Sequence, residues 1–211
     1  LLERAEHLDV AIAGAEANVL AALAGLGWRT AWVSVLPDSP IGHRVERGLR
    51  AAGVGISLVN RVPEGRVGVY FVEYGAEPRP TQVHFDRKDT AFSRILPEQV
   101  EWDRLLDTRI LHLTGVTAAI SPNACGILFE ASKRAKAAGV LVSFDVNYRA
   151  RMWTLEDAKG TLLRLINEAD IVFVRQHDAH LLFGTTDPEG SLAAIREHSS
   201  ARWVVVTDGV A

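Results

Sequence analysis

The chain has 211 residues, of which 48% are hydrophobic and 23% are charged, and its formal net charge at pH 7 is -3. This composition is typical of an ordinary globular domain that is long enough to bury a sizeable core. Because the chain has no basic excess with which to displace phosphate counterions, we expect no nucleic acid among its partners.

The first third of the chain predicts two helices around one strand. Residues 14–26 are expected to form a helix, residues 30–36 a strand, and residues 41–53 a second helix. The helix signals are the apolar stripe of Val19, Leu23 and Leu26 and, for the second helix, the spacing of Ile41, Val45 and Leu49 before Gly53.

Nothing in the chain predicts a membrane segment. Residues 10–28 come closest, but Glu16, Asn18 and three glycines interrupt the apolar run that a span requires. The first six residues also lack the positive charge of a signal peptide. The single Cys125 cannot form an intramolecular disulfide and reads as a small core residue of a helix. We therefore expect a cytoplasmic protein.

Two antiparallel strands of mixed polarity are predicted over residues 67–74 and 81–87. The link over residues 75–80 contains glycine and proline and joins the strands as a hairpin. The hairpin presents aromatic and charged side chains outward and is inserted in a chain that otherwise alternates strands with helices. Such a hairpin predicts a lid over a pocket.

From residue 109 onward, short apolar strands alternate with helices. Strands are predicted over residues 109–113, 140–144, 170–174 and 203–206, and helices over residues 121–139, 154–168, 178–183 and 188–198. Ser121-Pro122 and Thr154 mark where two of these helices begin. The alternation predicts a parallel sheet that is covered by helices on both faces.

Three polar side chains follow the strand over residues 140–144 at alternating positions: Asp145, Asn147 and Arg149. Ligands of open parallel sheets bind outside the carboxyl ends of the strands. A carboxylate, an amide and a guanidinium at that edge are suited to metal-bound phosphate, a hydroxyl and an anion, respectively. Asp145 taken alone reads as a turn cap, but the three residues together favour a ligand site.

With these elements placed, the chain resembles the ribokinase-like (PfkB) carbohydrate kinases, and most closely the 2-keto-3-deoxygluconate kinases. The segments that carry the resemblance are Ala13–Val19, Val35–Gly42, Ile110–Val116, Asp145–Arg149 with Trp153, Leu181–Gly184 and Val205–Gly209. The resemblance implies an α/β, ribokinase-like fold with a Rossmann-like, mainly parallel central sheet flanked by helices and a small β-strand lid within residues 67–87.

The resemblance also implies two sets of site residues. The residues that it places near the sugar are Gly14, Asn18, Tyr70, Phe85, Arg87 and Arg149. The residues that it places near the nucleotide are Asn147, Arg149, Arg175, Thr207 and Gly209. Arg175 has an alternative partner, because Asp178 lies one short helical turn away. The implied cofactors are ATP and Mg2+, and no metal-binding set of side chains is expected, since His177 and His180 lack a third ligand.

The predicted reaction is transfer of the ATP γ-phosphate to 2-keto-3-deoxygluconate. An acid sugar needs cations for its carboxylate, and Arg87 and Arg149 meet that need, whereas a neutral sugar offers those guanidiniums no partner. Two alternatives stay open: a fructokinase-type or ribokinase-type kinase of a neutral sugar, and a non-catalytic, sugar-acid-binding relic of the fold.

Several departures from the family pattern accompany the resemblance. Family members begin with a strand that carries a Gly-Glu pair, and their catalytic Asp lies in a late Gly-Ala-Gly-Asp segment; neither occurs in this chain. The family's Asn-x-x-Glu reads Arg175-Gln176-His177-Asp178 here. We therefore expect residues 1–211 to form a single, incomplete ribokinase-like domain without the catalytic Asp. The lid strands of relatives often pair between subunits, which makes a homodimer plausible.

Overall fold

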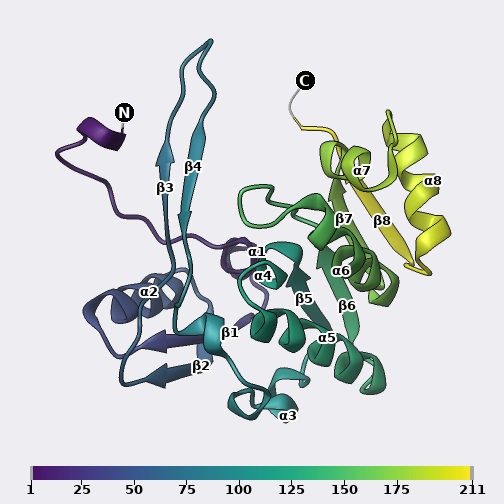
Figure 1. The fold of residues 1–211 in the computed structure, drawn as a ribbon. Coiled ribbons are helices and arrows are strands. Elements are labelled where there is room, and N and C mark those ends of the chain that lie inside the picture. Colours follow the sequence, from purple (N-terminus) through teal and green to yellow (C-terminus); the bar gives the residue numbers. More distant parts are fainter. Residues whose placement is uncertain (1, 210–211) are drawn as a thin grey trace. The chain divides into compact units, whose positions relative to one another are not determined.

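The computed structural model describes residues 2–209, which fall into two compact units with the boundary between Arg94 and Ile95. The first unit contains α1 (Ala15–Gly25), β1 (Ala31–Pro37), α2 (Pro40–Ala51), β2 (Gly55–Val62), β3 (Val69–Glu73) and β4 (Gln82–Asp86) (Figure 1). The second contains α3 (Trp102–Leu105), β5 (Ile110–Thr114), α4 (Gly115–Ala118), α5 (Pro122–Ala137), β6 (Leu141–Asp145), α6 (Leu155–Glu168), β7 (Ile171–Arg175), α7 (Gln176–Phe183), α8 (Pro188–His198) and β8 (Trp203–Thr207). Short 3₁₀ turns lie at Leu2–Arg4, Phe92–Arg94 and Pro97–Gln99. Within residues 2–209, no helix is long and apolar enough to cross a membrane.

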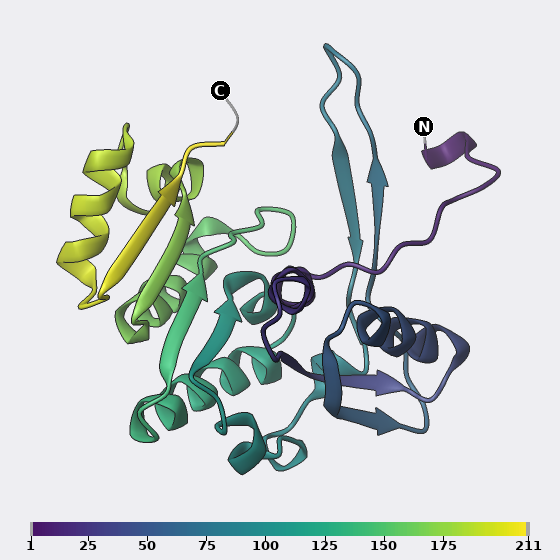
Figure 2. The ribbon, with the colours of Figure 1, turned by 180° about the vertical axis from the view of Figure 1, so that it is seen from behind.

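The second unit is built on the predicted parallel sheet. Its strands lie in the order β5-β6-β7-β8, every neighbouring pair is parallel, and helices separate the strands along the chain. Figure 2 shows the four strands from the side on which β7 and β8 lie in front. On these two strands, Phe173, Trp203 and Val205 remain 36%, 47% and 38% exposed, so the described residues leave part of one face uncovered. The predicted α/β architecture, a parallel sheet flanked by helices, is confirmed.

Local sequence signals place α5 and α6 correctly, whereas the short helices α3 and α4 are not among the predicted elements. The Ser121 side chain accepts a hydrogen bond from the Ala124 backbone N–H, and the Thr154 side chain accepts one from the Asp157 backbone N–H. Each bond satisfies an N–H that has no partner within its own helix. Between the helices and the sheet lies a continuous core, whose fully buried members include Phe144, Leu162, Leu165, Ile166 and Val172.

The first unit pairs β1 with β2 in parallel and packs α1 and α2 around a small core. The strand β2 is not among the elements that the sequence predicts. The buried members of this core are Ala17, Leu49 and Val54. The helix α1 contributes Ala17, with Leu20, Ala21 and Ala24 packed beside it.

The predicted apolar stripe on α1 is wrong, and so is one position of α2. Leu23 is 38% exposed and Leu26 is 75% exposed. The side chains of α1 that pack also follow the helical period, but they lie on another face of the helix, the face of Ala17, Leu20, Ala21 and Ala24. On α2, Ile41 is 58% exposed, while Glu46 is buried together with Leu49. Hydrophobic spacing alone therefore identified both helices but not the faces that pack.

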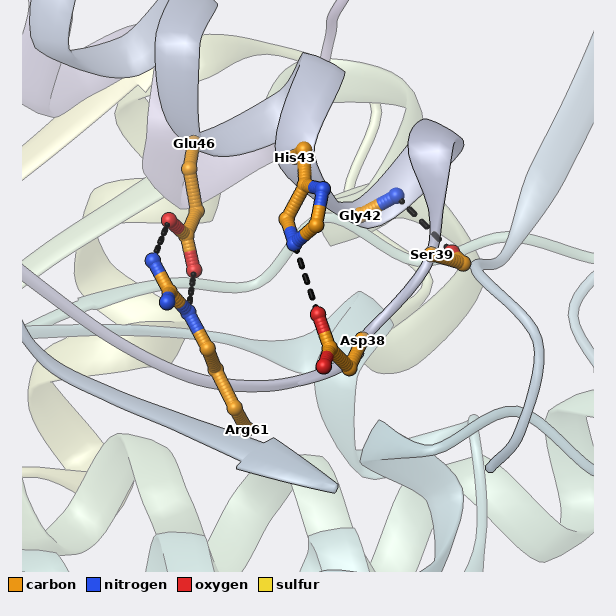
Figure 3. A network of polar contacts seen from close by, with 6 residues as sticks. All are labelled: Asp38, Ser39, Gly42, His43, Glu46 and Arg61. Atoms are coloured by element: carbon orange, nitrogen blue, oxygen red, sulfur yellow. Dashed lines mark hydrogen bonds and ion pairs between the residues drawn. The ribbon is translucent and has the colours of Figure 1, made fainter. Parts of the chain in front are cut away.

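Polar contacts join α2 to the carboxyl ends of β1 and β2 (Figure 3). Arg61 of β2 donates from Nε to Glu46 Oε1 over 2.8 Å and from Nη2 to Glu46 Oε2 over 2.5 Å. His43 Nε2 lies 2.7 Å from Asp38 Oδ1, and the Ser39 hydroxyl caps the helix at the Gly42 N–H. The hydrogen bond from Arg61 holds the pKa of the Glu46 carboxyl below its usual value. The paired carboxylate can therefore be buried.

The predicted hairpin is confirmed. β3 and β4 form an antiparallel two-stranded sheet of their own, in which Tyr70 lies opposite Phe85 and Glu73 opposite Gln82. Arg66 pairs with Asp86 at the base of the hairpin, and Arg79 lies 3.7 Å from Glu73 nearer its tip. That the hairpin acts as a lid stays a prediction.

Candidate functional site

The carboxyl ends of the parallel strands place polar side chains along one edge of the second unit. Thr114 at the end of β5 lies opposite Asp145 at the end of β6, and Arg175 at the end of β7 lies opposite Thr207 at the end of β8. The middle strands are in register as well, with Asp145 opposite Phe173. Such an edge is where parallel sheets bind ligands.

Asp145 is the electrostatic centre of this edge. Burial raises the pKa of its carboxyl, the backbone N–H of Asn147 donates a hydrogen bond that lowers it, and the charge of Asp178 raises it. The charges of Arg149 and Arg175 act in the lowering direction. Arg149, Arg175 and Asp178 therefore all lie close enough to act on the Asp145 carboxyl.

The loop after β6 holds Asn147 in a constrained conformation. Asn147 is 8% exposed and has a φ of 39°, in the left-handed region that few non-glycine residues adopt. The Val146 N–H bonds to the Phe173 carbonyl at 2.9 Å, and the Tyr148 hydroxyl donates to the Trp153 carbonyl at 3.3 Å. These contacts tie the loop to β7 and to its own far end. Strained residues of this kind often mark functional sites.

Gly115 allows the loop to approach the end of β5. A Cβ at this position would lie 2.1 Å from the Val146 carbonyl oxygen and 2.6 Å from a Leu162 methyl group. Any larger residue would push the backbone after β6 away from its place. The sequence reasoning did not single out Gly115, although it lies within the segment Ile110–Val116, directly after a strand.

At the end of β7, Arg175 makes the contact that the sequence offered as an alternative. Its Nε lies 3.1 Å from Asp178 Oδ2 and its Nη2 lies 2.7 Å from Asp178 Oδ1. The next strand ends at Thr207, which is exposed, and Gly209 follows with a φ of 79°. A Cβ at Gly209 would meet no atom of residues 2–207 within 4 Å, so among these residues nothing approaches this glycine closely, and its feature is the left-handed turn.

In the first unit, the hairpin gathers the three lid residues that the sequence predicts. The rings of Tyr70 and Phe85 lie 5.9 Å apart, and the guanidinium of Arg87 lies 5.4 Å from the Tyr70 ring and 5.2 Å from the Phe85 ring. Arg87 is half-buried, and its neighbour Asp86 pairs with Arg66. The aromatic rings therefore orient the Arg87 guanidinium.

The other predicted sugar residues of this unit lie where α1 begins. Gly14 directly precedes the helix, and its carbonyl accepts the first helical hydrogen bond from the Asn18 N–H over 2.8 Å. Asn18 is exposed. Arg149, by contrast, belongs to the second unit, so a shared cleft for Arg87 and Arg149 stays a prediction.

No set of three or more His, Cys, Asp or Glu side chains is arranged to hold a metal ion within residues 2–209. Asp178 has both carboxylate oxygens engaged by Arg175, so of these two carboxylates Asp145 is the better placed for a ligand. Magnesium in nucleotide sites is commonly held by one or two carboxylates together with phosphate oxygens and water. The edge therefore fits a magnesium ion that arrives with a phosphate ligand.

Comparison with known proteins decides the family. The model of the family described as pfkB family carbohydrate kinase matches residues 1–211. The chain belongs to the PfkB family of carbohydrate kinases. Its α/β fold with a parallel sheet is the ribokinase-like fold of that family, as the sequence resemblance implies.

Individual relatives give the same result. The chain is 34% identical over 209 residues to a 2-dehydro-3-deoxygalactonokinase of Haloferax volcanii, with 99% of this chain and 65% of the relative aligned. The crystal structure of a 2-dehydro-3-deoxygluconokinase from Thermotoga maritima matches with a TM-score of 0.88 and 33% identity, covering 98% of this chain and 66% of that one. A fructokinase with bound ATP from Xylella fastidiosa matches with a TM-score of 0.81 and 25% identity, covering 94% and 61%. The PfkB chain thus spans about two thirds of the length of these relatives.

Proposed function

We propose that the complete protein transfers the γ-phosphate of ATP to a hydroxyl of a 2-keto-3-deoxy sugar acid, with 2-keto-3-deoxygluconate as the preferred substrate. Membership of a carbohydrate kinase family supports the reaction class. Two relatives bear the names of kinases that act on the galactonate and gluconate forms of such an acid. The observation that carries the proposal is Arg149, half-buried in the loop after β6, where its charge acts on the Asp145 carboxyl and its guanidinium is a candidate partner for the carboxylate of the sugar acid.

On the sugar side, we propose that cations recognise the acid and that backbone and amide groups recognise the hydroxyls. Arg87, oriented by the rings of Tyr70 and Phe85, and Arg149 are the proposed partners of the carboxylate. Gly14 and Asn18 at the start of α1 are the proposed contacts to hydroxyl groups. A guanidinium without an anionic partner gains little from a neutral sugar.

On the nucleotide side, we propose that Asn147, Arg149, Arg175, Thr207 and Gly209 contact ATP. All five lie at or just after the carboxyl ends of neighbouring parallel strands. Asp145 is the proposed protein carboxylate for Mg2+, and the bound metal would neutralise the charge that develops on the transferring phosphoryl group. Residues 1–211 contain no Gly-Ala-Gly-Asp segment, so we assign none of them as the base that takes the hydroxyl proton.

The decisive experiment is a kinase assay on the protein encoded by the complete reading frame. ADP release with Mg-ATP is measured for 2-keto-3-deoxygluconate, 2-keto-3-deoxygalactonate, fructose and ribose. We expect the two acids to be preferred, and the gluconate form to be the better of them. Faster turnover of fructose or ribose would establish the neutral-sugar alternative, and calorimetric binding of the acid without turnover would establish the non-catalytic one.

Arg149→Ala tests the proposed specificity. A charge-assisted contact contributes about 1.5–3 kcal/mol, so we expect kcat/KM for the acid to fall about 10- to 100-fold and that for fructose to change less. Arg196→Ala, which removes an exposed arginine of α8, is the matched control and should leave both values unchanged. Equal losses on acid and neutral sugars would refute the role of Arg149 in recognising the carboxylate.

We also propose that the protein forms a homodimer through the hairpin and works in the cytoplasm. Within the described residues, β3 and β4 pair only with each other, and Val72 and Tyr74 are 38% and 80% exposed. An open strand edge with exposed hydrophobic side chains favours pairing with a second copy. Light scattering should give the mass of a dimer for the wild type and of a monomer for Val72→Lys; a wild-type monomer would contradict the proposal.

A further inference from the structure

Asp178 is a buried carboxylate whose two oxygens are both committed to one arginine. It lies in the first turn of α7 with a fully buried side chain. Arg175 donates to it from Nε over 3.1 Å and from Nη2 over 2.7 Å. Two parallel hydrogen bonds hold a guanidinium in one plane and one direction, which a single contact does not.

The guanidinium that Asp178 holds is itself accessible. The Arg175 side chain is 49% exposed, whereas that of Asp178 is 0% exposed. A guanidinium has five N–H groups, and the pair with Asp178 uses two of them. The remaining N–H groups are available to an anionic ligand, because the buried partner lies on one side of the guanidinium only.

The position of Arg175 in the sheet indicates a function for its pair with Asp178. Arg175 ends β7, between Asp145 at the end of β6 and Thr207 at the end of β8. At this edge, β7 therefore ends in Arg175, which Asp178 holds, and the neighbouring strand β6 ends in the carboxylate of Asp145. Arg175 neutralises the buried Asp178, and the exposed side of the same guanidinium lies at this edge, where it can also meet an anion.

We infer that Asp178 is a positioning residue that holds the Arg175 guanidinium at the carboxyl end of β7, where it binds a phosphate group of the nucleotide. This inference rests on the proposed kinase function. It assigns Asp178 to orienting a cation and not to ligating a metal, since both of its oxygens are already engaged. Nucleotide binding by this chain then draws on a protein cation as well as on Mg2+.

Calorimetric binding of ATP and of adenosine to the complete protein, each with Mg2+ and with EDTA, tests the inference. We expect Arg175→Ala to weaken ATP binding about 10- to 100-fold, in EDTA as well as with Mg2+, and to leave adenosine binding unchanged. Asp178→Asn should weaken ATP binding about 3- to 10-fold, because Arg175 keeps its charge but loses its fixed direction. Arg202→Ala is the matched control: Arg202 lies directly before β8, at the opposite end of the sheet, and its loss should leave ATP binding unchanged.

A second variant covers the possibility that Asp178→Asn does not fold. Arg175→Lys keeps the positive charge but cannot form the two-pronged contact with Asp178, so it should lose most of the ATP affinity that Arg175→Ala loses. Wild-type ATP affinity in Arg175→Lys, or in a folded Asp178→Asn, would overturn the positioning role. Equal losses for ATP and adenosine would also overturn it, because they would show a general structural effect.

The outcomes for the two proposals are separable. Wild-type protein that binds ATP through Arg175 but phosphorylates none of the four sugars refutes the proposed function alone. Wild-type protein that phosphorylates the acid while Arg175→Ala keeps full ATP affinity refutes the inference alone. Wild-type protein that binds no ATP refutes both.

Discussion

The two units of the chain bury their hydrophobic residues to different degrees. In the second unit, one continuous core joins the sheet to α5 and α6, with Phe144 and Ile166 fully buried. In the first unit, Ala17, Leu49 and Val54 form a small buried cluster with partly buried residues around it. The other buried hydrophobic residues of this unit are Val35, Leu36, Leu58 and Ala91. Ion pairs and arginine–aromatic contacts occur in both units, such as Glu46 with Arg61 in the first and Arg164 with Phe129 in the second.

This difference in hydrophobic burial matches the function that we propose for each unit. Phosphate groups need charges held at set positions, and a close-packed sheet fixes the ends of its strands. Recognition of a sugar that enters and leaves suits elements with fewer buried contacts, because such elements open at a lower free-energy cost. Four substitutions test whether the second unit is more closely packed than the first.

The largest expected effect comes from the core of the second unit. Phe144→Ala removes a fully buried ring from the middle of β6 and should lower the free energy of unfolding by about 3–5 kcal/mol. Chemical denaturation followed by circular dichroism measures this loss. A loss below about 1 kcal/mol would show that the core of this unit is loosely packed and that the two units do not differ in packing.

In the first unit, Leu49→Ala should cost about 2 kcal/mol, the lower end of the usual range, because fewer buried neighbours surround it. Hydrogen exchange read by mass spectrometry should show faster exchange in α1, α2, β1 and β2, with β5–β8 unchanged. Faster exchange throughout both units would mean that they unfold as one cooperative body.

Glu46→Gln removes the charge that Arg61 binds and should lower the melting temperature by about 3–6 °C at pH 7. The hydrogen bond from Arg61 lowers the pKa of Glu46, so the stabilisation is present above the usual carboxyl pKa and is lost as the pH falls through the lowered one. The difference from wild type should therefore shrink in acid.

The matched control for this variant is Glu130→Gln, whose partner Arg134 lies one helical turn away on the surface of α5. It should change the melting temperature by about 1 °C or less. A difference at Glu46 that persists unchanged at pH 3 would contradict the electrostatic explanation.

The smallest effect is expected at Asp145, and its sign is opposite. Burial raises the pKa of this carboxyl, so the folded protein favours its protonated form, and stability is lost as the pH rises through the raised pKa. Asp145→Asn should therefore raise the melting temperature by about 2–4 °C at pH 7–8, and the gain should fade near pH 3–4. Thermal melts across this pH range measure it; a variant that is less stable at pH 8 would show that Asp145 is retained for structure.

The sequence by itself determined the elements whose signals are local. Ser121, Thr154 and Asp187 each bond to an N–H three residues further along, so the beginnings of α5, α6 and α8 depend on neighbours in the chain alone. The apolar runs of β5–β8, which alternate with helices along the chain, predicted a parallel sheet flanked by helices. Parallel strands in turn required Asp145, Asn147, Arg149 and Arg175 to gather at one edge.

Only the tertiary structure decided which faces pack and which charges pair. The helix α1 packs through Ala17 and Ala24 instead of Leu23, because small residues let it approach its partners, and hydrophobic spacing does not record the partner. Glu46 and Arg61 are 15 residues apart and meet only once β2, which the sequence did not reveal, lies beneath α2. Likewise, Asp178 was visible as a possible partner of Arg175, but its complete burial, which makes the pair directional, arises from packing around α7 that no local pattern encodes.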